Sequence, residues 1–288
     1  MQKVTVLAPA KINLALDITG LTENGYHALD TIMQAVSLYE KIEISKSTGF
    51  SLRLPGSRVP AGPGNTATAA AEAFFYETGL LAGADITIHK KTPTRAGMGG
   101  GSADAAGVLA GLNKLYNAGL TIQELCKIGT RVGADVPFCL LGGTARATGI
   151  GDILTPLSPL PDCHIVIAMP RGMGVSTPAA FARYDEEGSP VHPDMEEAVL
   201  AVQQQDLEGL LPHIQNALEY TSGDKTTKNI RFVMQKYGAL ASCMTGSGAA
   251  VFGIFPNFKA AQKVGRILRL HAAQVFVTQP VPYGPRVS

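Results

Sequence analysis

A glycine-rich loop that runs directly into a helical pattern restricts the fold of this chain more than any other feature. Four of the five residues from Gly97 to Gly101 are glycine, and Ser102 follows them. Downstream, apolar residues recur at three- and four-residue spacing as far as Tyr116, and Gly119 stands where a glycine often ends a helix. The pattern predicts a helix that begins at the loop.

Such a loop can hold an anion. A helix N-terminus carries unpaired N–H groups and the positive end of the helix dipole, and glycines before it let the backbone approach a phosphate closely. Ser102 is a natural N-cap for this helix. The alternative is a tight strand-to-helix turn that binds nothing. The lysine of a P-loop is absent, and the spacing departs from the dinucleotide-binding pattern.

Strand and helix patterns alternate along the rest of the chain, and Pro-rich residues 155–161 mark the best internal boundary. Ala8-Pro9-Ala10 is expected to join the first two strands, and the segment around Thr245-Gly-Ser-Gly248 is strand-like. The predicted strands are 4–7, 12–18, 41–45, 51–54, 84–89, 164–169 and 242–255. The predicted helices, besides the one after the loop, are 66–78, 121–133, 194–205, 206–218 and 260–270. This mixture predicts an α/β or α+β protein in two lobes.

Composition excludes several classes of protein. The 288 residues are 45% hydrophobic and 16% charged, which is typical of a globular chain of one or two domains. A net charge of +1 gives no support for nucleic-acid binding. No signal peptide, transit peptide or bilayer-spanning apolar run is visible, so we expect a cytoplasmic protein without a membrane partner. Four scattered cysteines without metal-ligand spacing predict buried free thiols.

Three motifs together resemble the GHMP kinases, the superfamily of galacto-, homoserine, mevalonate and phosphomevalonate kinases. The stretch P-x-x-x-G-M-G-G-G-S-A-D-A-A is similar to its phosphate-binding signature, the segment 8–14 to its N-terminal signature, and the segment 244–249 to its C-terminal glycine motif. The resemblance implies an α+β, two-lobed GHMP kinase architecture. Residues 1–155 would form a nucleotide-binding domain that is ribosomal-protein-S5-like, residues 156–288 a ferredoxin-like domain, and the active site would lie between them.

Three shorter segments indicate a subgroup. Lys11-Ile-Asn-Leu, Gly25-Tyr-His27 and Gly133-Ala-Asp-Val-Pro137 resemble the kinases of the non-mevalonate isoprenoid pathway. Those enzymes use ATP to phosphorylate the 2-hydroxyl of 4-diphosphocytidyl-2-C-methyl-D-erythritol. The competing interpretations are a GHMP kinase for another alcohol, of the mevalonate, homoserine or sugar type, and a non-catalytic nucleotide-binding regulator on the same fold. The oligomeric state stays open.

Lys11 and Asp135 match the catalytic pair of the family. A carboxylate can accept the proton of an attacking hydroxyl, and a nearby ammonium keeps that carboxylate ionised. Each residue has an ordinary structural alternative. Lys11 could be a solvated lysine on an edge strand, and Asp135 could cap a short helix.

The resemblance also implies a nucleotide site and a magnesium ion that neutralises the phosphates. Asn65 matches a residue near the adenine, and it could also be a helix N-cap. The sequence shows no dedicated carboxylate cage for the metal, so its ligands stay unknown. The remaining residues implied to bind ATP are Pro93, Thr94, Arg95, Ala96, Gly97, Met98, Gly99, Gly100, Gly101, Ser102, Ala103, Gly246, Ser247 and Gly248.

A last group matches positions that bind the cytidine-diphosphate-linked acceptor. Tyr26 could stack on a pyrimidine and His27 could hydrogen-bond its polar edge, or the two could be a buried tyrosine and a surface histidine beside a turn. Phe181 is a candidate for the opposite stacking face, or a core residue, and Thr177 belongs to the same segment. Asn13 shares a strand face with Lys11.

Four positions depart from the family pattern. Ala103 replaces a serine, Met98 a leucine and Thr66 an apolar residue, while Arg95 stands where a small or apolar residue is usual. The Arg95 charge could contact a phosphate or only solvent.

Overall fold

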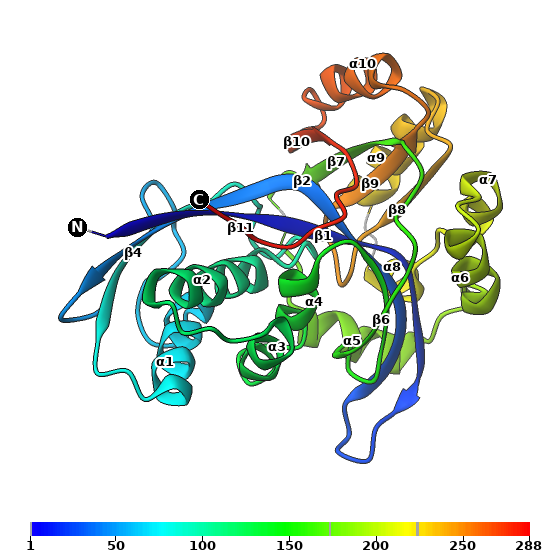
Figure 1. The fold of residues 1–288 in the computed structure, drawn as a ribbon. Helices are drawn as coiled ribbons and strands as arrows, with labels where there is room; N and C mark the ends of the chain where they lie inside the picture. Colours follow the sequence, from blue (N-terminus) through cyan, green and yellow to red (C-terminus); the bar gives the residue numbers. More distant parts are fainter. Residues whose placement is uncertain (1, 173, 223–224) are drawn as a thin grey trace.

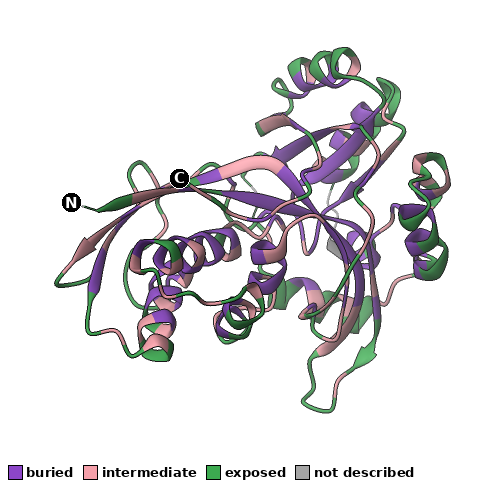
Figure 2. Ribbon diagram, viewed as in Figure 1, coloured by how far each residue is buried: buried purple, intermediate pink, exposed green. Residues whose placement is uncertain are grey.

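The computed structural model describes residues 2–172, 174–222 and 225–288. Two sheets and their covering helices form an α+β fold, as predicted (Figure 1). The buried residues lie in the strands of the two sheets and on the helix faces that pack against them (Figure 2).

The first sheet is built on a long antiparallel hairpin of β1 (Lys3–Leu21) and β2 (His27–Ser47). Its order is β11-β1-β2-β4-β3, with β5 beside β2 and β6 beside β5. The other strands of this sheet in the described chain are β3 (Ser51–Arg53), β4 (Gly83–His89), β5 (Thr144–Thr148), β6 (Ile153–Pro156) and β11 (Arg286–Val287).

The hairpin corrects two expectations. The strands predicted at 4–7 and 12–18 are one strand, whose register shifts between Pro9 and Ala10, because a bulge accommodates a residue without an N–H. The prediction of 41–45 covers only the end of β2. Residues 30–36 are buried without interruption, so this part of β2 lacks the period-two pattern of a half-exposed strand.

Four helices cover one face of this sheet: α1 (Thr66–Thr78), α2 (Gly100–Tyr116), α3 (Ile122–Thr130) and α4 (Val136–Leu141). Helix α2 packs unusually close to the sheet, because a Cβ at Gly107 or Gly111 would overlap the side chain of Ile42 or Ile44.

The local signals for these helices are largely confirmed. Helix α1 has the predicted bounds, and α3 has the complete Thr121–Glu124 capping box. Helix α2 departs from its prediction at both ends. It begins at Gly100 with Gly99 as N-cap, which places Ser102 inside the first turn, and its C-cap is Asn117 rather than a glycine at 119.

The second sheet is antiparallel and has the order β10-β7-β9-β8 in the described residues. Its strands are β7 (His164–Pro170), β8 (Ala241–Met244), β9 (Val251–Phe255) and β10 (Ala272–Thr278). Helices α9 (Lys225–Lys236) and α10 (Phe258–Leu268) cover one face, and the other face packs against the β1–β2 hairpin. This order of strands and helices is the ferredoxin-like pattern that was expected. The segment predicted as strand over 242–255 is two strands, β8 and β9, joined by a loop.

The helices between β7 and α9 are α5 (Thr177–Glu187), α6 (Met195–Gln203), α7 (Leu207–Leu210), the 3-10 turn η1 (Leu211–His213) and α8 (Ala217–Ser222). The single helix predicted over 206–218 is wrong, because Pro212 cannot continue a helix and forms a 3-10 turn instead. The sequence patterns missed the helices α5 and α9 and the strands β5, β6, β10 and β11. In α5 only Ala180 is buried, so no apolar periodicity marks it.

The chain leaves the first sheet after Pro156 and enters the second at His164, but its last residues return to the first sheet. The Val281 amide donates to the Ala35 carbonyl over 2.9 Å, and β11 pairs with β1. The division into residues 1–155 and 156–288 therefore stays a prediction. Within the described ranges, no helix is long and apolar enough to cross a membrane. The thiols of Cys139, Cys163 and Cys243 are buried and that of Cys126 is half-buried, all of them free.

Candidate active site

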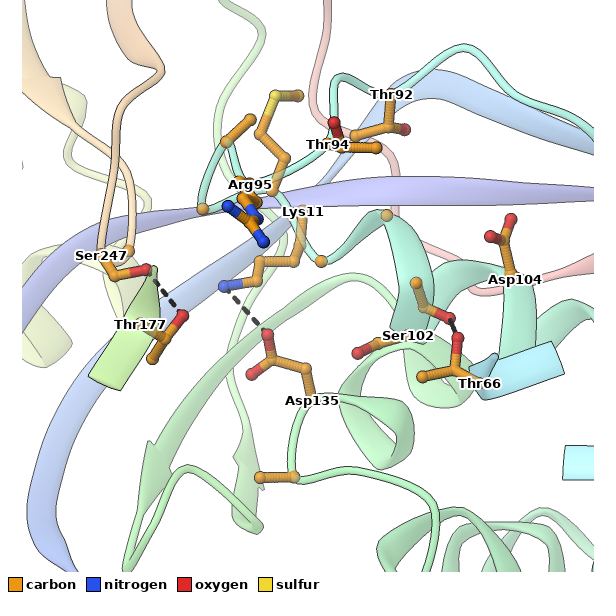
Figure 3. Close-up of a pocket in the computed structure, with 18 of the residues that line it drawn as sticks. Lys11, Thr66, Thr92, Thr94, Arg95, Ser102, Asp104, Asp135, Thr177 and Ser247 are labelled. Carbon is orange, nitrogen blue, oxygen red and sulfur yellow. Dashed lines mark hydrogen bonds and ion pairs between the residues drawn. The ribbon is translucent and has the colours of Figure 1, made fainter. Parts of the chain in front are cut away.

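A cavity of about 700 Å³ lies between the glycine loop, β1, the start of α4 and the start of α5 (Figure 3). Gly246 and Ser247, from the loop between β8 and β9, also line it. The cavity thus draws its walls from segments that lie far apart in the sequence.

The glycine loop can adopt its path only because it lacks side chains. Gly97 and Gly99 have left-handed backbones, with φ of 73° and 64°. A Cβ at Gly97 would overlap the Thr245 carbonyl, and a Cβ at Gly99 would lie 3.0 Å from Lys11 Cγ. The loop therefore brings the first turn of α2, with its unpaired amides, to the wall of the cavity.

Lys11 and Asp135 meet in this cavity. The Lys11 Nζ lies 3.2 Å from Asp135 Oδ2 (Figure 3). It also donates to Asn13 Oδ1 over 2.8 Å. The Lys11 side chain is only 6% exposed, so it is not the solvated lysine of the structural alternative. Asp135 occupies the N-cap position of α4, but its side chain makes no capping hydrogen bond and is 31% exposed. Its carboxylate is therefore available to a ligand.

Asn13 connects this pair to two distant loops. Its Nδ2 donates to Thr31 Oγ1 over 2.9 Å, and its backbone N–H donates to Thr245 Oγ1 over 2.9 Å. Thr245 Oγ1 in turn donates to the Gly97 carbonyl over 3.2 Å. One buried hydroxyl thus joins β1, the glycine loop and the β8–β9 loop.

A buried charge cluster supports the start of α2 and was missed by the sequence analysis. Lys90 Nζ donates to Glu40 Oε1 over 2.8 Å, to Asp104 Oδ2 over 2.6 Å and to the Gly100 carbonyl over 3.1 Å. Burial raises the pKa of Asp104 to about 7, with Glu40 adding to the effect and Lys90 opposing it. Asp104 points away from the Lys11–Asp135 pair (Figure 3). The available signal was a carboxylate among the alanines of an apolar helix face.

The residues expected to hold a pyrimidine form a different contact. The His27 ring stacks on Phe181 with centroids 4.4 Å apart, and His27 Nε2 lies 2.7 Å from Asp185 Oδ1. Phe181 lines the cavity, whereas Tyr26 is 65% exposed and does not. His27 is not among the lining residues either, so it meets the cavity only through its stacking on Phe181, and Tyr26 lies apart.

Most of the other expected residues line the cavity. Both polar atoms of Asn65 are occupied, since Nδ2 donates to the Pro60 carbonyl and Oδ1 accepts from the Ala67 amide that it caps. Ala103 is in the core beneath the loop, and Gly248 does not line the cavity. The expected residues that line it are Lys11, Asn13, Asn65, residues 93–102, Asp135, Thr177, Phe181, Gly246 and Ser247. Those missed from the sequence include Val59, Pro60, Thr66, Lys90, Thr92 and Asp104.

The donor set fits a magnesium ion that arrives with a nucleotide. The described residues contain no group of three His, Cys, Asp or Glu side chains that could hold a metal by themselves. Magnesium bound to phosphates needs only one or two protein oxygens and keeps several waters. The Ser102 hydroxyl lines the cavity and could supply one of them.

Two protein-family models match the chain, one in each half. Residues 65–143 match the model of the GHMP kinases N terminal domain, and residues 200–274 match that of the GHMP kinases C terminal domain. The first match contains the glycine loop and Asp135, and the second contains the loop between β8 and β9.

Curated relatives match nearly the whole chain. The 4-diphosphocytidyl-2-C-methyl-D-erythritol kinase of Carboxydothermus hydrogenoformans is 41% identical over 286 residues, covering 97% of this chain and 98% of its own. The protein of the same name from Clostridium tetani is 35% identical, covering 96% of this chain and 99% of its own.

Solved structures of GHMP kinases have the same fold as this chain. A crystal structure of 4-(cytidine 5'-diphospho)-2C-methyl-D-erythritol kinase has a TM-score of 0.82 at 33% identity, covering 96% of this chain and 98% of that one. A homoserine kinase from Cytophaga hutchinsonii, at 18% identity, has a TM-score of 0.78 with 100% and 98% coverage, and shares the fold alone. The chain therefore belongs to the GHMP kinases and, among these small-molecule kinases, to the 4-diphosphocytidyl-2-C-methyl-D-erythritol kinase family.

Proposed function

We propose that this kinase transfers the γ-phosphoryl group of ATP to the 2-hydroxyl of 4-diphosphocytidyl-2-C-methyl-D-erythritol. The observation that carries the proposal is the Lys11–Asp135 contact of 3.2 Å in the cavity that the glycine loop lines. The names of the curated relatives support this choice of acceptor.

In the proposed reaction, Asp135 accepts the proton of the acceptor hydroxyl as its oxygen attacks the γ-phosphorus. A new O–P bond forms, the bond from the γ-phosphorus to the β–γ bridging oxygen breaks, and ADP leaves with that electron pair. The Lys11 ammonium stabilises the Asp135 carboxylate before the transfer and the negative charge on the oxygens during it. Asn13 positions Lys11 through the 2.8 Å hydrogen bond to its ammonium.

The remaining chemistry is alignment and charge neutralisation. The first-turn amides of α2 and the glycine loop would hold the phosphates of ATP, since the helix dipole favours anions there. Magnesium, when bound, would neutralise the phosphate oxygens, with the Ser102 hydroxyl as a protein ligand within the cavity. A cytoplasmic location stays a prediction.

The acceptor would lie along α5. Its cytosine would contact Phe181 and His27, and Asp185 would fix the orientation of the His27 ring through the 2.7 Å contact. Because His27 already covers Phe181, one of the two rings must move, or the base must stack on the outer face of the pair.

The test is ADP release from ATP with 4-diphosphocytidyl-2-C-methyl-D-erythritol, compared with either compound alone. We expect release only with both, and competitive inhibition by cytidine diphosphate against the acceptor. Equal or faster release with mevalonate, homoserine or galactose would contradict the proposed acceptor. ATP binding without release with any alcohol would instead indicate a regulator.

A further inference from the structure

Arg95, which the family resemblance placed among the ATP-binding residues, is an exposed cation at the cavity, and the proposed reaction leaves it without a role. Its side chain lines the cavity, together with Lys11, Thr177 and Ser247 (Figure 3). Arg95 makes no hydrogen bond or ion pair with any residue that the structure describes. A planar guanidinium without a protein carboxylate offers its paired N–H donors to a ligand, and phosphate is the group that these donors fit best.

The backbone at Arg95 is held in an unfavourable conformation. Its φ is 53°, in the left-handed region where residues with a Cβ are uncommon. Strain of this kind persists only where the surroundings impose it, and it is a reason to look for a function.

A second segment holds the stem of Arg95 in place. Gly174 lies between β7 and α5, and a Cβ there would be 3.0 Å from Arg95 Cβ and 3.3 Å from Arg95 Cδ. The backbone before α5 therefore packs directly on the arginine stem. This contact places the arginine stem beside the segment that leads into α5.

The start of α5 is itself suited to an anion. The N-cap residue Ser176 makes no capping hydrogen bond with its side chain, and the Thr177 and Ser247 hydroxyls are 3.0 Å apart at the wall of the cavity. Phe181 lies one turn after Thr177 on the same helix face, about 6 Å along the axis. A nucleotide whose base contacts Phe181 would thus have its 5′-phosphates near Thr177 and Arg95.

We propose that Arg95 binds the diphosphate of the cytidylyl acceptor, in a site formed with the N-terminus of α5 and separate from the α2 site for the ATP phosphates. This proposal rests on the proposed function, because it assigns the acceptor to α5. Arg95 acts as a specificity residue that selects a nucleoside diphosphate over an uncharged nucleoside.

The first experiment compares binding of cytidine and cytidine diphosphate by calorimetry, in the wild-type protein and in Arg95→Met. Methionine keeps an unbranched stem against Gly174 and removes the guanidinium. We expect the preference of the wild-type protein for cytidine diphosphate to fall about tenfold or more in the variant, as for loss of one charge-assisted contact. Binding of ADP should be unchanged.

Three variants separate the guanidinium from its surroundings. Arg95→Gly removes the same group but relieves the strained backbone, so it should share the effect of Arg95→Met. Arg95→Lys keeps the charge without the planar donors and should recover part of the preference. Arg183→Met, which removes an exposed arginine elsewhere on α5, is the control. It should leave the preference for cytidine diphosphate over cytidine unchanged.

Steady-state kinetics gives the second measurement, with wild-type activity as the check on the proposed function. If the wild-type enzyme is active, Arg95→Met should raise KM for the acceptor about tenfold and leave KM for ATP unchanged. Unchanged kinetics, or a rise confined to KM for ATP, would overturn the assignment of Arg95. Absence of wild-type activity with this acceptor would instead contradict the proposed function, and the calorimetric preference would still test Arg95.

Discussion

Asp135 shows how one residue can satisfy a structural pattern and still be free for chemistry. It precedes Val136-Pro137, a common start for a helix, and it does occupy the N-cap position of α4. Its carboxylate nevertheless makes no capping bond and contacts Lys11 instead. The position in the helix therefore explains where Asp135 lies, and the contact with Lys11 explains what it can do.

This separation predicts a loss of turnover in Asp135→Asn. The amide cannot accept the proton of the acceptor, so kcat should fall about a hundred- to ten-thousand-fold, the usual range for loss of a general base. ADP formation measures this, and calorimetry with ADP shows whether the nucleotide site persists. Asp206→Asn, at the N-cap of α7 where asparagine caps equally well, should retain full activity. Near-normal turnover in Asp135→Asn would show that Asp135 is not the general base.

Asp104 leads to a prediction about pH. Its pKa is raised from 3.8 to about 7, so the folded protein keeps a proton over this range that the unfolded chain releases. The free energy of unfolding should therefore fall as pH rises from about 4 to 7, as far as this group contributes. Asp104→Asn has no such proton and should lack this contribution.

Urea unfolding of the two proteins between pH 5 and 8 measures the effect. The wild-type protein should lose stability relative to Asp104→Asn as pH rises from 5 to about 7, and the difference should level off above that. Asp206→Asn, which removes an exposed carboxylate outside the Lys90 cluster, is the matched control. If the curves of Asp104→Asn and the wild-type protein are parallel, burial does not raise the pKa of Asp104 as inferred.

At the scale of elements, glycines decide how the glycine loop meets its neighbours. Gly99 is both the left-handed N-cap of α2 and the residue over which the Lys11 stem passes. The helix therefore begins before Ser102, because Gly99 turns the chain and Gly100 is already helical. The glycines thus set the first turn of α2 and leave space for the Lys11 side chain.

Gly99→Ala should impair catalysis more than folding. The new Cβ would lie 3.0 Å from Lys11 Cγ and 3.1 Å from its Cε, so the lysine must shift. We expect kcat to fall on the order of ten- to a hundredfold, because small displacements of catalytic groups have large effects. Gly119→Ala has a similar φ of 71° with nothing within 4 Å, and it should lower stability by about 1 kcal/mol without changing kcat. Similar kcat losses in both variants would assign the effect to backbone strain.

At the scale of the whole molecule, Thr245 holds the two lobes around the cavity. Its hydroxyl accepts from the Asn13 amide, which is 232 residues away in the sequence, and donates to the Gly97 carbonyl. Thr245 is fully buried. If its hydroxyl were removed, the Asn13 amide and the Gly97 carbonyl would each lose a hydrogen bond that water cannot easily replace.

Thr245→Val keeps the shape of the side chain and removes the hydroxyl. We expect the free energy of unfolding to fall by about 1–3 kcal/mol, the cost of leaving buried polar groups unpaired. Chemical denaturation measures this. Ser242→Ala, on the neighbouring strand β8, is the control, because its buried hydroxyl has no hydrogen-bond partner in the described residues and its loss should be neutral or stabilising. An equal loss in both variants would rule out the bridging role of Thr245.

The sequence by itself determined what nearest neighbours along the chain control. The bounds of α1 and the capping box of α3 follow from residues within a few positions of one another. The prediction that the glycine loop binds an anion rests on the same kind of local pattern. The residues of the loop, Lys11 and Asp135 could be named because their local motifs resemble a known family.

Only the tertiary structure decided which distant groups meet. The hydrogen bond between Lys90 and Glu40 spans 50 positions, and the one between Asn13 and Thr245 spans 232, so no local spacing could indicate either. The length of β2 was hidden for a related reason, since burial on both faces removes the alternation that marks a strand. Local preference is set by interactions along the chain, whereas the site is set by burial and by pairing across it.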